Sequence, residues 1–343
     1  MIRAAVLATA LLAAAGAQAA SSDDVARFYA GKQVSLYIGS TPGGGYDSYA
    51  RLIARHLGDH LPGAPSIVPV NMPGAGGNKV AYYIYAVAPK DGTAIGAIFP
   101  GGVMEPLIGD KPVQHDPTKL VYLGSANTEV FVCYVRADAP VKSFKDALAT
   151  EVSMAPSAEG GSTRDFPLML DHVLGAKFKI VVGYPGSREM MLAIEQGEVA
   201  GQCGISISSL ATAMPDWIPS GKVRVLAQEG SKLDPALAKL GVPLTIDFAR
   251  TDDERQVLEL MYSQGVFGRP YVVPPGVPPE RVAALRQAFI ETLRDRATLE
   301  DAKRMRLAVD PVAGEEVQTL VAKVFATPPQ IVKRLKDAIA TAP

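Results

Sequence analysis

The feature that most constrains the fold is an alternation of strand-like and helix-like segments joined by glycine-rich turns. An apolar run at 33–39 (QVSLYIG) precedes PGGG, and YDSYARLIARHLG then places its apolar residues at helical spacing. Gly58 is expected to end that helix. The pattern is repeated by SIVPVNM, a glycine loop, VAYYIYAVA and TAIGAIF. This βαβαβ rhythm predicts a parallel sheet covered by helices on both faces.

A second set of the same kind lies at about residues 126–225, in EVSMAP, FPLMLDHVLG, FKIVVGY, PGSREMMLAIEQG and VAGQCGIS. The length of 343 residues is comfortable for two domains. We therefore predict a discontinuous α/β domain 1, residues 21–125 plus 226–343, and an α/β domain 2, residues 126–225. The helical C-terminal stretches, such as PERVAALRQAFIETLRD, are expected to pack back on domain 1.

Residues 1–20 have the pattern of a secretory signal peptide. An arginine near the start precedes an apolar run from about residue 4 to 15, and AQA supplies the small residues that a signal peptidase recognises. Cleavage is expected near Ala19 or Ala20. The apolar run is too short to span a bilayer, and the first cysteine, Cys133, is too distant for lipid attachment. The sequence therefore predicts a soluble, exported protein.

Charge and motifs argue against several classes of function. A net charge of −1 without runs of like charge does not suit a nucleic-acid partner. GAGGNKV lacks the GK[ST] ending of a Walker loop, and PGGGYD is not GxGxxG, so no nucleotide cofactor is expected. Neither a GxSxG elbow nor metal-ligand spacing of histidines is present. We expect no enzymatic activity, cofactor or metal.

The chain has two cysteines, Cys133 and Cys203. An oxidising compartment permits a disulfide between them, whereas two small residues buried separately in strands are the alternative. The sequence leaves both open, because it does not place the two residues within bonding reach.

Three glycine-rich junctions between a strand and a helix form the candidate site: 42–47 (PGGGYD), 73–77 (PGAGG) and 157–163. Glycine lets backbone amides approach an anion, and the helix N-terminus adds free N–H groups and partial positive charge. For one junction alone, a tight turn is the simpler interpretation. Three junctions in two similar domains favour a shared cleft, since ligands bind beyond the carboxyl ends of parallel strands.

Five segments occur in the order typical of one family: LYIGSTPGGGYDSYARLIARHL, VNMPGAGGNKVA, APKDGTAIG, GYPGSREMMLAIEQGEVAGQCG and FGRPYVVPPGVPPERVAALRQAF. They resemble the substrate-binding proteins of tripartite tricarboxylate transporters, the TctC or Bug family. The resemblance covers nearly the whole mature chain. It implies a two-domain periplasmic binding protein of type II-like α/β fold, a Venus flytrap with its ligand cleft between the lobes. The implied partners are a mono-, di- or tricarboxylate ligand and the permease subunits of the transporter, with the binding protein a monomer.

The resemblance also implies the ligand-binding residues. In the family the first loop meets the ligand carboxylate through backbone amides, and its aspartate caps the helix. The second-domain loop holds the other end of the ligand, and a tyrosine and a glycine precede the next helix. The matching residues are Gly43, Gly44, Gly45, Tyr46, Asp47, Ser157, Gly161, Ser162, Thr163, Arg164, Tyr184, Gly186 and Ser187.

Three positions depart from the family's pattern. Tyr46 stands where many relatives have a small residue such as threonine, Arg164 where many have a small polar residue, and Ala200 where aspartate is common. Tyr46 is expected to narrow the cleft or to stack on a ring of the ligand. Arg164 is either a bidentate partner for a second carboxylate or a surface helix residue. The identity of the carboxylate stays open.

Two other functions remain open. One is a ligand-sensing subunit that docks on a receptor kinase, which neighbouring genes for membrane partners would distinguish from a transport protein. The other is an enzyme that processes a carboxylate, which turnover of the bound acid would reveal.

Overall fold

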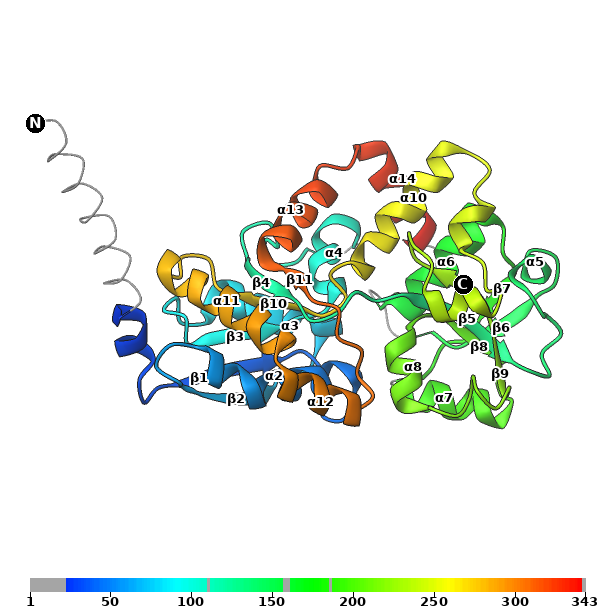
Figure 1. Cartoon of the computed structure of the whole chain (residues 1–343). Coiled ribbons are helices and arrows are strands. Elements are labelled where there is room, and N and C mark those ends of the chain that lie inside the picture. Colours follow the sequence, from blue (N-terminus) through cyan, green and yellow to red (C-terminus); the bar gives the residue numbers. More distant parts are fainter. Residues whose placement is uncertain (1–22, 110–111, 157–160, 185–186, 341–343) are drawn as a thin grey trace, which may run out of the picture.

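The computed structural model describes residues 23–109, 112–156, 161–184 and 187–340, in two lobes that are each built on one sheet (Figure 1). The predicted signal peptide and the predicted site residues Ser157 and Gly186 lie outside these ranges. Within the described ranges, no helix has the length and apolar character needed to cross a membrane.

The sheet of lobe 1 has the strand order β11-β4-β10-β3-β1-β2. Its members are β1 (Gln33–Ile38), β2 (Ser66–Asn71), β3 (Ala94–Ala97), β4 (Val121–Ser125), β10 (Pro270–Val273) and β11 (Val312–Ala313). The predicted parallel pairing holds for β1 with β2 and with β3. β10, which runs antiparallel to β3 and β4, and β11 lie outside the segments for which parallel pairing was predicted, and they make the sheet mixed. β10 begins where the chain returns from the other lobe, so it enters the sheet from the end opposite to the one at which β3 and β4 begin.

The sheet of lobe 2 has the order β7-β6-β8-β5-β9. Its members are β5 (Phe131–Arg136), β6 (Val152–Met154), β7 (Phe178–Ile180), β8 (Gly201–Ser206) and β9 (Val223–Glu229). β6 pairs in parallel with β7 and β8, whereas β5 is antiparallel to β8 and β9. This sheet is therefore also mixed. Because β9 continues to Glu229, a domain border at residue 225 would divide a paired strand.

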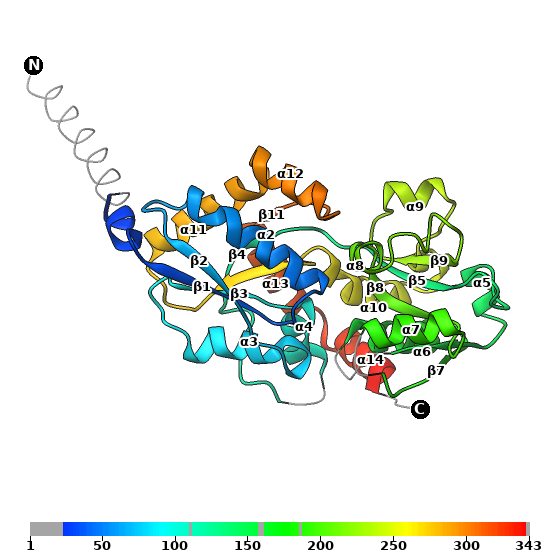
Figure 2. The same ribbon diagram turned by 90° about the horizontal axis from the view of Figure 1, so that it is seen from below.

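The helices of lobe 1 cover its sheet from both sides (Figure 2). They are α2 (Gly45–His60), η1 (Ala75–Gly77), α3 (Asn78–Tyr82), the π-helical turn η2 (Tyr83–Val87), α4 (Pro100–Ile108), α11 (Pro279–Arg294), α12 (Arg296–Arg304) and α13 (Gly314–Phe325). α2 buries Tyr49, Leu52, Ile53 and Leu57 on one face, as its apolar spacing predicts. The helix continues two residues beyond Gly58, the predicted end.

The helices of lobe 2 include the last helix of the chain. They are α5 (Phe144–Ala147), α6 (Ser162–Leu174), α7 (Ser187–Gln196), α8 (Ile207–Ala213), α9 (Pro235–Lys239), η3 (Thr245–Phe248), α10 (Asp252–Tyr262), η4 (Ser263–Gly265) and α14 (Pro329–Ala340). α14, red in Figure 1, packs against α6 and α10 and buries Ile331, Leu335 and Ile339. The C-terminal helices thus divide between the lobes: α11 to α13 pack in lobe 1, whereas α14 packs mainly on lobe 2 and also contacts α4.

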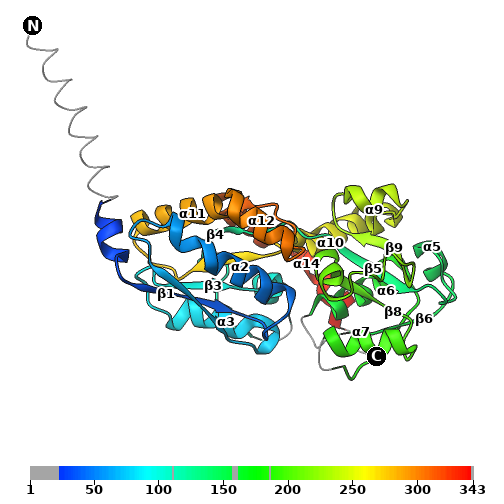
Figure 3. The same ribbon diagram turned by 60° about the horizontal axis from the view of Figure 1, so that its bottom comes forward.

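The chain crosses between the lobes at residues 126–130, 266–269 and 326–328 (Figure 3). The first crossing joins β4 to β5, the second joins η4 to β10, and the third joins α13 to α14. We propose on this packing that the domain borders lie at these crossings, so that residues 226–265 and α14 belong with domain 2.

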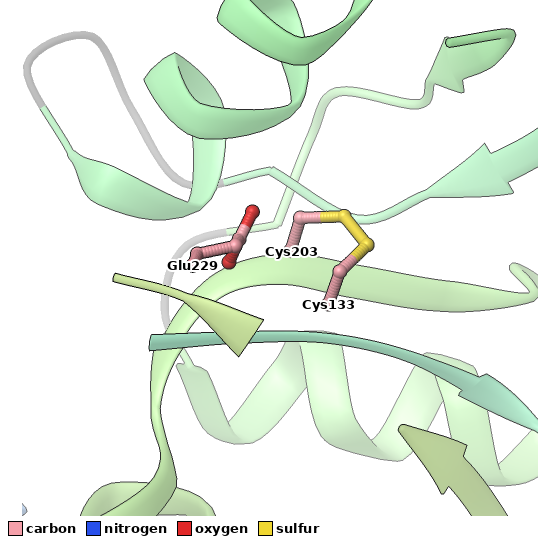
Figure 4. Close-up of side chains that lie close together, drawn as sticks. All are labelled: Cys133, Cys203 and Glu229. Carbon is pink, nitrogen blue, oxygen red and sulfur yellow. A yellow bond between two sulfur atoms is a disulfide. The ribbon is translucent and has the colours of Figure 1, made fainter. Parts of the chain in front are cut away.

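Cys133 on β5 and Cys203 on β8 form a disulfide and are both fully buried (Figure 4). The antiparallel pairing of these two strands brings the cysteines together. Glu229 on β9 lies beside them, and the three residues make the one cluster of metal-ligand types found in the described part of the chain. Since the two sulfur atoms are bonded to each other, neither is a thiolate that could bind a metal ion.

Candidate functional site

Asp47, in the first turn of α2, holds the first glycine loop in place. Its carboxylate accepts hydrogen bonds from the Gly43 N–H at 2.9 Å, from Arg51 Nε at 2.9 Å and from Asn71 Nδ2 at 2.8 Å. Burial alone would raise the pKa of Asp47, but these hydrogen bonds outweigh it and lower the pKa below its ordinary value. Asp47 thus supports the loop as a carboxylate whose charge is balanced by Arg51.

The start of α2 has no side-chain cap. Gly44 is the N-cap residue, with extended backbone and without a side-chain hydrogen bond to the first turn. Gly43, just before it, has a φ of 88°, which glycine adopts without the cost that a side chain imposes. The first-turn N–H groups therefore carry the partial positive charge of a sixteen-residue helix with no side chain capping them.

Tyr46 is enclosed by two other side chains of lobe 1. Its ring meets Phe99 edge-on, with 4.0 Å between ring centroids, and the Cζ of Arg269 lies 4.0 Å above its centroid. Burial raises the pKa of Tyr46 to about 12, so its hydroxyl is protonated at neutral pH. Because Arg269 covers one face of the ring, this arrangement favours Tyr46 as a wall that narrows the cleft rather than as a platform for a ligand ring.

Phe99 joins the first two glycine loops. A Cβ placed on Gly77, whose φ is 94°, would lie 2.1 Å from Phe99 Cδ2, so the backbone of the second loop packs directly on this ring. The same ring contacts Tyr46 in the first loop. Sequence reasoning missed Phe99, which stands at the N-cap of α4.

The third junction leads into α6 in lobe 2. This helix begins at Ser162, after the N-cap residue Gly161, and again has no side-chain cap. Gly204 on β8 lies directly beneath its start, where an added Cβ would be 2.1 Å from the Ser162 carbonyl oxygen. The N–H of Gly204 donates to Glu229 Oε2 at 2.6 Å. A glycine and a buried glutamic side chain thus fix where α6 starts.

Two of the other predicted residues of lobe 2, Arg164 and Tyr184, are held by neighbouring side chains. Arg164, with 14% of its side chain exposed, pairs through Nη1 with Asp165 Oδ1 at 2.8 Å, so it is not a solvated surface residue. Tyr184 donates its hydroxyl to Glu198 Oε1 at 2.7 Å. Thr163 is buried in the first turn of α6. Ser187 is the first residue of α7.

One predicted residue lines a hollow between the lobes. Ser162 borders a small space between α6 and α4, together with Gly101, Met104 and Glu105 from lobe 1 and Gln264 from η4. A wider groove of about 550 Å³ lies elsewhere, among α4, α13 and α14. None of the three glycine junctions lines that groove, and only the third of them, through Ser162, borders the small space.

A buried ion pair that the sequence analysis missed lies beside the start of α2. Arg269 Nη2 is 3.0 Å from Glu129 Oε1, and the two side chains are 2% and 1% exposed. Each stands in an otherwise apolar stretch, GVFGRPYVV and TEVFVCYV. A charged residue within an apolar stretch was the sequence signal that could have revealed this pair, because a buried charge needs a partner.

The two mixed sheets and the three crossings between them define the class of fold, that of two-lobed periplasmic solute-binding proteins. Three similar solved structures have this fold, and each of them aligns with this chain nearly end to end. One is a TctC solute-binding protein from Polaromonas without ligand, at 18% sequence identity and a TM-score of 0.64, with 88% of this chain and 98% of that chain aligned. The second is MatC from Rhodopseudomonas palustris with bound malate, at 20% identity and a TM-score of 0.65, with 90% of this chain and 99% of that chain aligned. The third is the periplasmic binding protein BugD, at 22% identity and a TM-score of 0.68, with 90% of this chain and 97% of that chain aligned. These neighbours are binding proteins rather than enzymes. No family model and no curated protein matches the chain.

Proposed function

We propose that this chain is an extracytoplasmic solute-binding protein of the TctC or Bug type, which captures a small organic carboxylate between its lobes. The observation that carries the proposal is the pair of uncapped helix N-termini, α2 in lobe 1 and α6 in lobe 2, each preceded by glycine. Their N–H groups and partial positive charges suit carboxylates at the two ends of one ligand. The fold agrees with this, since MatC has malate bound.

The proposal extends to transport. A protein exported to the periplasm by its signal peptide would bind the acid there and deliver it to the permease subunits of a tripartite tricarboxylate-type transporter. Cells that lack this gene should then lose uptake of the acid that the protein binds. Normal uptake, with loss of a transcriptional response to the acid, would instead indicate the sensing subunit.

Binding itself is tested by a thermal-shift screen with mono-, di- and tricarboxylates and aromatic acids. A ligand at about a hundred times its Kd stabilises the folded state by about 2.7 kcal/mol, so a true ligand should raise the melting temperature clearly. Calorimetry then gives its affinity. No shift with any acid would contradict the proposal, and a changed acid recovered after incubation would indicate an enzyme.

The site is tested with variants of that protein. Ser162→Ala and Tyr184→Ala should each weaken binding of the acid identified in the screen by about tenfold or more, because a hydrogen bond to a charged group contributes about 1.5–3 kcal/mol. Ser66→Ala, on the exposed edge strand β2, is the matched control and should bind like the wild type. Unchanged affinity in both site variants would refute this location for the site.

A further inference from the structure

The ion pair between Arg269 and Glu129 joins two of the three crossings between the lobes. Glu129 lies on the first crossing, residues 126–130, and Arg269 on the second, residues 266–269. With both side chains at most 2% exposed, the pair has lost the stabilisation that water gives to charges. Such a pair persists only when neighbouring groups supply further hydrogen bonds.

Arg269 is fixed to lobe 1 through its backbone. Its N–H donates to Ser125 Oγ at 3.0 Å, and its carbonyl oxygen accepts from the Ala126 N–H at 3.0 Å. Its guanidinium also lies against two rings of α2, with Cζ 4.0 Å from the centroid of Tyr46 and 5.0 Å from that of Tyr49. Arg269 therefore moves with the first glycine loop.

The end of the same side chain reaches lobe 2. Nη2 of Arg269 lies 3.0 Å from Ser208 Oγ, 3.2 Å from Ser209 Oγ and 3.4 Å from Ser206 Oγ, at the junction of β8 and α8. Ser208 in turn donates to Glu129 Oε1 at 2.6 Å. One guanidinium nitrogen, with two hydrogens, is thus shared among Glu129 and three serine hydroxyls.

Two atoms of the pair have no partner. Arg269 Nε and Glu129 Oε2 are both buried without a hydrogen bond. A two-bond fork between guanidinium and carboxylate, from Nε and Nη2 to both oxygens, would satisfy them together. The observed arrangement gives up that fork, and the hydrogen bonds to the serines of lobe 2 offset the loss.

We propose that Arg269 is a positioning residue that couples the separation of the lobes to the first glycine loop. With the lobes together, Nη2 of Arg269 is shared with the serines of α8. These groups lie beside the start of α2, because an added Cβ on Gly45 would be 3.4 Å from Nη2 and 3.0 Å from Ser209 Oγ. When lobe 2 turns away, the serines leave and Arg269 forms the two-bond fork with Glu129. The inference rests on the proposed function only in that the lobes must separate to admit a ligand.

The test measures the distance between the lobes without ligand. Nitroxide labels at two exposed positions, Leu299 on α12 of lobe 1 and Leu240 after α9 of lobe 2, report this distance by pulsed electron resonance. The double variant Ser208→Ala/Ser209→Ala removes hydroxyls that act only when the lobes are together. The ratio of separated to closed molecules should therefore rise about tenfold.

Thr212→Ala is the matched control, because its hydroxyl on α8 donates to the Ser208 carbonyl oxygen and to no atom of Arg269. It should leave the distance distribution unchanged. The single variants Ser208→Ala and Ser209→Ala should each give part of the shift, and they keep the test available if the double variant does not fold. An unchanged distribution in the serine variants, or an equal shift in the control, would overturn the proposal. Since no ligand is present, this result does not depend on whether the protein binds a carboxylate.

Discussion

Replacing the buried Glu229 with glutamine should change how the stability of the protein depends on pH. Glu229 is fully buried beside the disulfide, on β9 of lobe 2 (Figure 4). Burial raises its pKa from 4.5 to about 8, and the hydrogen bond from the Gly204 N–H opposes the rise only in part. Between these two values the folded chain keeps a proton that the unfolded chain has lost.

The sign and size of the effect follow from that proton. Because the folded state binds one proton more, the free energy of unfolding falls as pH rises, by about 1.4 kcal/mol per pH unit. Over the interval from 4.5 to about 8 the loss amounts to roughly 5 kcal/mol. Glutamine stays neutral throughout and can still accept from Gly204. Glu229→Gln should therefore gain stability relative to the wild type by that amount across the interval.

The assay is urea unfolding of both proteins at intervals from pH 4.5 to 8.5, without reductant so that the disulfide stays intact. The quantity of interest is the difference between the two free energies of unfolding, in which the other titrating groups cancel. Glu259→Gln, on an exposed position of α10, controls for loss of a carboxylate as such. Parallel pH profiles for Glu229→Gln and the wild type would refute the reasoning.

Two further predictions concern the disulfide and the candidate site. Cys133→Ala/Cys203→Ala should lower the free energy of unfolding by about 4 kcal/mol, as the chain-entropy relation gives for a closed loop of 70 residues, and an unchanged urea midpoint would contradict this. Asp47→Ala leaves three hydrogen-bond donors without their acceptor. It should cost about 2 kcal/mol in thermal unfolding and weaken ligand binding, whereas normal binding would show that the loop does not need this support.

Local patterns in the sequence were sufficient for much of the fold. The helix from Gly45 and the strands that flank the glycine loops follow from the spacing of apolar residues and from turn residues within a few positions. Such features depend only on residues that lie within a few positions in the sequence. The start of α2 is different: Asp47 was expected to cap this helix, whereas the N-cap is Gly44 without a side-chain cap, and Asp47 accepts from the Gly43 N–H instead.

The tertiary structure decided what depends on residues far apart in sequence. Nothing local distinguishes α14 from α13, yet α14 packs on lobe 2, where α6 and α10 offer an apolar surface to its buried face. The direction of β10 follows from the path of the chain between lobes. The pairing of Arg269 with Glu129 exists only where two crossings meet.

The sequence by itself thus determined a two-part α/β chain with glycine loops suited to an anion. Only the tertiary structure determines that Tyr46, in the first of these loops, lies under Arg269 and against Phe99. The reason is physical: helices, turns and loops are set by local backbone preferences, whereas a buried charge or ring takes its partner from whichever element packs against it.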